Sequence, residues 1–115
     1  MRSWSNNMDM VNEIFKLTAE LDASISRLKD NGCNLAEKER DYKILVNTTA
    51  LKLRADGMAV TLIELIIYGN KDVAKARMER DIAETIYQTN LEHINVTKLK
   101  LRLLEAQVER EWGKQ

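Results

Sequence analysis

The stretch from Lys71 to Trp112 contains neither glycine nor proline, and proline is absent from the whole chain. Without these two residue types nothing in the stretch breaks a helix. At ~1.5 Å per residue, one helix of this length would extend about 60 Å. Such a helix is longer than a small single-domain core can cover. We therefore predict that part of it packs against a second protein chain.

The remainder of the chain is also predicted to be helical, which makes the fold all-α within a single domain, residues 1–115. Apolar residues recur every three or four positions, as on one face of a helix. Asp30-Asn31-Gly32 is predicted to end one helix and Asp56-Gly57 another, while Asn34 with Glu37 forms a capping-box pattern between them. The first two helices are expected to pair as a hairpin. The predicted helices cover residues 8–29, 34–56, 60–68 and 71–112.

The third predicted helix is short and almost entirely apolar. We expect it to be buried over most of its surface, with Thr61 as its N-terminal cap. A β-strand is the alternative for this β-branched segment. We favour the helix because a single strand would have no partner.

The long helix carries two opposed apolar faces. One face is predicted to be buried within the chain and to include Trp112 as a buried anchor; its members are Ala76, Ala83, Ile86, Tyr87, Leu91, Ile94, Leu101, Leu104, Val108 and Trp112. The second face consists of Val96, Leu99, Leu103 and Ala106. Because a surface helix of a monomer needs one apolar face, we predict that the second face is an oligomer interface. The alternative is that the hairpin covers both faces within one chain.

No motif for catalysis or for binding a metal or cofactor is present, so we predict a non-enzymatic protein without cofactors. His93 is the only histidine and Cys33 the only cysteine, which is too few for a metal site and leaves one weak nucleophile–base pair. A single cysteine cannot form an intramolecular disulfide, which fits the cytoplasm. The most apolar segment, Met58 to Tyr68, is too short to span a bilayer and contains Glu64.

The charge balance argues against nucleic acid as a partner. The chain has 18 basic and 18 acidic residues, so no general attraction to phosphate is expected. Lys98, Lys100 and Arg102 form a local basic cluster and are the candidate phosphate contacts. Residues 53–68 read superficially as a helix-turn-helix, but the second helix lacks basic residues that would contact DNA.

Part of the sequence resembles small uncharacterised helical proteins of phages and prophages of low-GC Gram-positive bacteria. The resemblance is carried by the segments Glu39–Tyr42, Leu53–Met58, Glu79–Glu84 and Leu103–Gly113, and residues 1–38 match less clearly. It implies a bacterial host cytoplasm and a setting among early phage functions for DNA replication and recombination. It implies no activity and no functional residues.

These observations together predict a helical, homo-oligomeric phage accessory protein that acts through protein–protein contacts, in DNA replication or recombination. The protein partner is not identified by the sequence. Two alternatives remain open. One is an inhibitor of a host enzyme or defence system, and the other is a protein that binds single-stranded nucleic acid, which ordinarily requires a basic groove with stacking aromatic residues.

Overall fold

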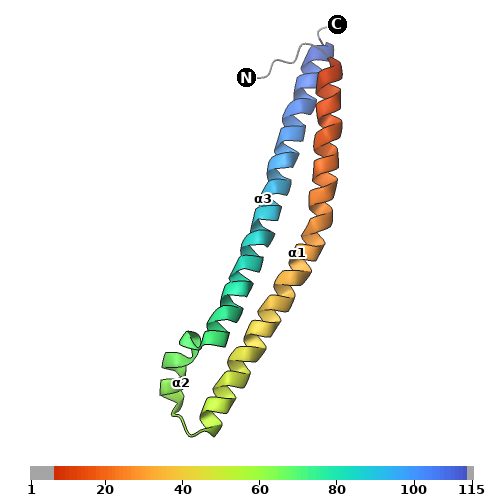
Figure 1. Ribbon diagram of the computed structural model, residues 1–115. Coiled ribbons are helices and arrows are strands. Elements are labelled where there is room, and N and C mark those ends of the chain that lie inside the picture. The colour runs from red at the N-terminus through yellow and green to blue at the C-terminus, as the bar shows by residue number, and fades with distance from the viewer. Residues whose placement is uncertain (1–6, 114–115) are drawn as a thin grey trace. The chain divides into compact units, whose positions relative to one another are not determined.

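The computed structural model describes residues 7–113, which form helices joined by short connections (Figure 1). α1 covers Asn7–Ala55, α2 covers Val60–Ile66, a 3₁₀ turn η1 covers Ile67–Gly69, and α3 covers Lys71–Gly113. The predicted all-α class is confirmed, and the described residues contain no strand. The long C-terminal helix was predicted within one residue of its observed end.

The described chain divides into two compact units. Unit 1 contains residues 7–29 and 89–113, and unit 2 contains residues 30–88. Within each unit a stretch of α1 lies antiparallel to a stretch of α3 (Figure 1). The hairpin is therefore formed by α1 and α3, and the predicted pairing of residues 8–29 with 34–56 is wrong.

Both long helices carry a heptad repeat on their covered side. Fully or partly buried residues alternate at spacings of four and three, which is the repeat of paired, coiled helices. On α1 they are Met10, Ile14, Leu17, Leu21, Ser24, Leu28, Asn31, Leu35, Lys38, Tyr42, Leu45 and Thr49. On α3 they are Val73, Ala76, Arg80, Ala83, Tyr87, Asn90, Ile94, Thr97, Leu101, Leu104, Val108 and Glu111.

The predicted break at Asp30-Asn31-Gly32 does not exist, because α1 continues through it. Asn34 is accordingly an interior helical residue and not an N-cap. Gly32 has no left-handed backbone; among described residues a positive φ occurs at Gly57 alone. A Cβ atom at Gly32 would lie 3.3 Å from Cε1 of Tyr87. The glycine thus permits close approach of two helices, which is the other common use of a missing side chain.

Gly57 does end α1, as predicted, and its φ of 93° gives the physical reason. Its N–H donates to the carbonyl of Arg54 at 3.0 Å, and the N–H of Met58 donates to the carbonyl of Leu53 at 3.1 Å. This pair of bonds is the Schellman arrangement, in which a left-handed residue satisfies the last carbonyls of a helix. At the start of α3, Asn70 Oδ1 accepts from the N–H groups of Asp72 and Val73 at 3.0 and 3.1 Å. Asn70 is therefore an N-cap.

The short helix α2 is far less buried than predicted. Only Ile63, together with Ile67 at the start of η1, is buried, and both join Tyr42 and Val73 in the core cluster of unit 2. The apolar residues Leu62, Leu65 and Ile66 remain exposed. Ala59, not Thr61, is the N-cap, and it makes no side-chain capping bond. A helix packed at the end of a two-helix unit can be covered on one side only.

Two residues that the sequence analysis assigned to a buried face, Ile86 and Trp112, are exposed, and so is the apolar Ile25 of α1. Ile25 is 47%, Ile86 48% and Trp112 54% exposed. Each lies beside the seam: the buried position next to Ile25 is Ser24, and the partly buried position next to Ile86 is Tyr87. Trp112 follows Glu111 at the end of α3 in the same way, so the predicted aromatic anchor is wrong.

Candidate interaction surfaces

The predicted second face of the long helix lies on the uncovered side of α3 in unit 1. Val96, Leu99 and Leu103 are 39%, 48% and 61% exposed, and Ala106 is also exposed. These four residues are called the C-terminal patch. Neighbouring Thr97 and Leu101 are buried. The hairpin therefore covers one face of α3 and leaves the other open, which removes the alternative that it covers both.

The three candidate phosphate contacts are exposed but do not form one surface. Lys98, Lys100 and Arg102 follow one another at steps of two residues, and each step turns about 200° around a helix. Lys100 therefore borders the C-terminal patch on one side and Arg102 borders it on the other. Lys98 lies on the Arg102 side, further from the patch.

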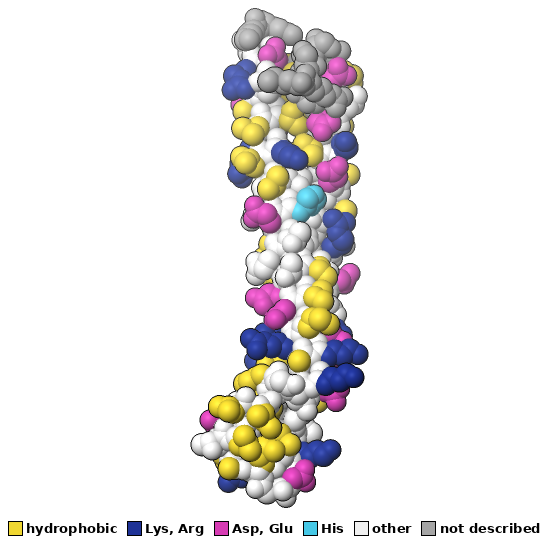
Figure 2. Space-filling view, turned by 60° about the vertical axis from the view of Figure 1, so that its left-hand side comes forward, with side chains coloured by type: hydrophobic (Ala, Val, Ile, Leu, Met, Phe, Trp, Pro, Cys, Tyr) yellow, Lys and Arg dark blue, Asp and Glu magenta, His cyan; other side chains and the backbone are white. Residues whose placement is uncertain are grey.

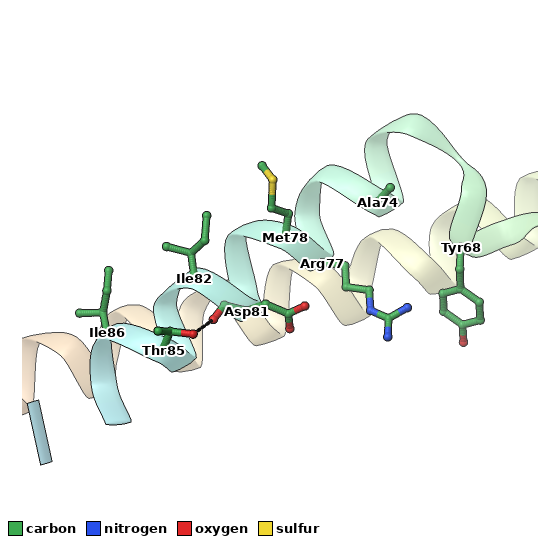
Figure 3. Close-up of a pocket in the computed structure, with 8 residues that line it drawn as sticks. All are labelled: Tyr68, Ala74, Arg77, Met78, Asp81, Ile82, Thr85 and Ile86. Atoms are coloured by element: carbon green, nitrogen blue, oxygen red, sulfur yellow. Dashed lines mark hydrogen bonds between the residues drawn. The ribbon is translucent and has the colours of Figure 1, made fainter. Parts of the chain in front are cut away.

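In unit 2 the outer side of α3 forms a groove of about 570 Å³. Figure 3 shows Met78, Ile82 and Ile86 projecting from successive turns of α3 on the same side. Tyr68, Ala74, Arg77, Asp81 and Thr85 complete the lining. This set of eight residues is called the α3 groove. Apolar side chains at intervals of four residues on an open helix surface are the pattern that accepts another helix.

The groove is bordered by acidic side chains. Asp81 Oδ1 accepts from Arg80 Nε at 3.1 Å and Nη2 at 2.7 Å. That hydrogen bond raises the pKa of Arg80, against a smaller lowering by burial. The Arg80 guanidinium also lies 4.7 Å from the centre of the Tyr42 ring. On the other border, Glu79 Oε2 is 3.7 Å from Lys38 Nζ.

A further apolar surface lies on α2 and η1. Leu65 is 82% exposed, and Val60, Leu62, Ile66 and Tyr68 are roughly half exposed. Figure 2 shows hydrophobic side chains gathered over this end of unit 2. Large apolar side chains that adjoin one another on a surface commonly mark a contact with another protein.

Sequence reasoning missed the α3 groove, although the pattern was available. The 3–4 spacing of the C-terminal patch extends backward along α3 through Glu92, Thr89 and Thr85 to Ile82 and Met78. The polar residues in the middle conceal the continuity, because they divide the apolar residues into two groups. In addition, Ile86 of the groove was assigned to the covered face of the long helix, and Ile82 was assigned to neither face.

A cluster of hydrogen-bonded polar side chains lies between α1 and α3 in unit 1. Ser24 is fully buried. Asn90 Nδ2 donates to the carbonyl oxygen of Ser24 at 3.0 Å and to its Oγ at 2.9 Å. Ser24 Oγ also lies 3.0 Å from His93 Nδ1. This polar layer ties one position of α1 to one position of α3, and a buried polar layer of this kind can specify the register of paired helices.

The polar layer does not resemble a reactive centre. A nucleophilic serine must reach a substrate, whereas Ser24 has no exposed surface. His93 Nδ1 lies beside the Ser24 hydroxyl, and Cys33 is exposed on α1. Across residues 7–113, no three His, Cys, Asp or Glu side chains are grouped so that they could hold a metal ion.

None of the described helices combines the length and apolarity needed to cross a membrane. Comparisons of the chain with protein-family models, with curated proteins and with solved structures found no match.

Proposed function

We propose that this protein acts without catalysis, as a helical protein that binds other proteins and first of all a second copy of itself. The observation that supports the proposal is the C-terminal patch, where Val96, Leu99 and Leu103 expose apolar surface on the side of α3 that α1 does not cover. Full burial of a leucine contributes ~1.5–3 kcal/mol. Covering the roughly half-exposed Leu99 and Leu103 would contribute about half of that for each residue.

The proposed setting is DNA replication or recombination of a phage in the cytoplasm of a bacterial host. It is supported by the resemblance of residues 39–113 described above. In this setting the exposed apolar residues of α2, which are Val60, Leu62, Leu65 and Ile66, are available for a protein partner.

The test is the mass of the protein in solution. Multi-angle light scattering should give an oligomer for the parent and a monomer for the variant Leu99→Glu with Leu103→Glu. The matched control is Phe15→Glu with Ile25→Glu, since these α1 residues are 68% and 47% exposed, close to the values for Leu103 and Leu99. The control should keep the parent's mass. A monomeric parent would contradict the proposed self-association.

A further inference from the structure

We propose that the second copy binds antiparallel along α3, with the α3 groove of each copy on the C-terminal patch of the other. The inference rests on the proposed self-association and adds its register. The two surfaces occupy the same heptad positions of one helix, since Met78 and Ile82 fall in phase with Leu99 and Leu103. When two helices pack through their heptad positions, each seam residue of one helix contacts a defined seam residue of the other.

The register follows from matching the apolar layers at the two ends of the contact; the layers between them pair Thr85 with Val96 and Thr89 with Glu92. The apolar seam of a heptad repeat has two kinds of positions, a and d. In an antiparallel pair, each a position of one helix faces a d position of the other. With the two-fold axis between Asn90 and Leu91, Leu103 of one copy faces Met78 of the other. Leu99 then faces Ile82. The helix contact does not extend to the ends of α3. There Lys71 of one copy would face Arg110 of the other, and two positive charges repel each other.

The same register joins opposite charges on both borders. Lys100 of one copy lies beside Glu79 of the other, and Arg102 lies beside Asp81; each pair occurs twice by symmetry. The salt bridges within each chain do not prevent these contacts. A carboxylate has about four acceptor sites on its two oxygens. Arg80 bonds to Oδ1 of Asp81, and Lys38 lies 3.7 Å from Oε2 of Glu79. Each carboxylate can therefore accept a second cation at its other oxygen.

Other arrangements of the same surfaces lack this match. If two C-terminal patches paired with each other in antiparallel fashion, Lys100 would face Lys100 and Arg102 would face Arg102. A parallel pair would place Asp81 beside Ile86 and Arg102 beside Gln107, without any ion pair. Charges at such borders select the orientation and register of paired helices more than they add affinity.

The register can be tested by exchanging charges between copies. Variant one carries Glu79→Lys and Asp81→Lys, and variant two carries Lys100→Glu and Arg102→Glu. Each variant alone places like charges together at all four border contacts, so its dimer dissociation constant should rise by about tenfold or more. In an equimolar mixture every border contact again joins opposite charges. The mixture should therefore form a heterodimer with nearly the parent's affinity, measured by sedimentation equilibrium.

The folding of each variant is checked by circular dichroism, and formation of the heterodimer would itself show that both are folded. A mixture that stays monomeric, or single variants that dimerise as well as the parent, would overturn the register. If Leu99→Glu with Leu103→Glu still abolishes association in that case, the proposed function stands without the register. A monomeric parent would overturn both.

Discussion

Asn90→Ala should destabilise the protein although the replacement is the better helix former. Asn90 is 7% exposed, and its Nδ2 donates to the carbonyl oxygen and Oγ of Ser24 at 3.0 and 2.9 Å. Each hydrogen bond contributes ~0.5–1.5 kcal/mol net, and a buried polar group left unsatisfied costs ~1–3 kcal/mol. Ser24 Oγ retains His93 at 3.0 Å, so most of the penalty is the loss of two bonds. We expect a loss of about 2 kcal/mol.

The matched control is Asn95→Ala, an exposed asparagine on the same helix. Both substitutions change intrinsic helix propensity equally, so the difference between them isolates the polar layer. For a chain of 115 residues, a difference of about 2 kcal/mol should lower Tm by roughly 8 °C. The assay is thermal unfolding followed by circular dichroism, at one protein concentration because association would shift Tm.

Replacing both partners should behave differently from removing one. Ser24→Ala combined with Asn90→Leu removes both buried polar side chains that bond to each other at this layer, and His93, which loses Ser24, is an exposed residue. Exchanges of a buried polar pair for apolar residues are often neutral or stabilising. The double variant should therefore unfold at a higher temperature than Asn90→Ala. If Asn90→Ala costs no more than Asn95→Ala, the polar layer does not stabilise the helix pair and the reasoning is wrong.

Gly57→Ala should destabilise by about 1–2 kcal/mol, because the φ of 93° is unfavourable for a residue with a Cβ atom. Gly69→Ala is the control in denaturant unfolding, since its φ is not positive and no atom lies within 4 Å of its added Cβ; an equal effect of the two would contradict the capping role of Gly57. Trp112→Ala should cost less than about 1 kcal/mol, because Trp112 is 54% exposed. A loss of about 3 kcal/mol in the same denaturant assay would show that the ring is buried in solution.

The sequence alone was sufficient for the helical class and for the two opposed faces of α3. The absence of proline and the 3–4 spacing are local properties that act within each helix whatever it packs against. The same holds for the turn at Gly57, where the backbone conformation is set by one residue. The C-terminal patch was also predicted from spacing. It lies on the side of α3 opposite Leu101, so a helix that covers Leu101 cannot also cover the patch.

Only the tertiary structure decided which residues the chain covers. Gly32 reads as a helix end, but it is an interior residue because Tyr87 of the other helix approaches it. Ser24 and Asn90 are polar, yet they are buried, since Asn90 donates hydrogen bonds to Ser24 across the helix pair. Ile86 reads as core and is exposed, because the seam passes through its neighbour Tyr87. Helix formation is determined by local sequence, whereas burial depends on which surface a distant helix occupies.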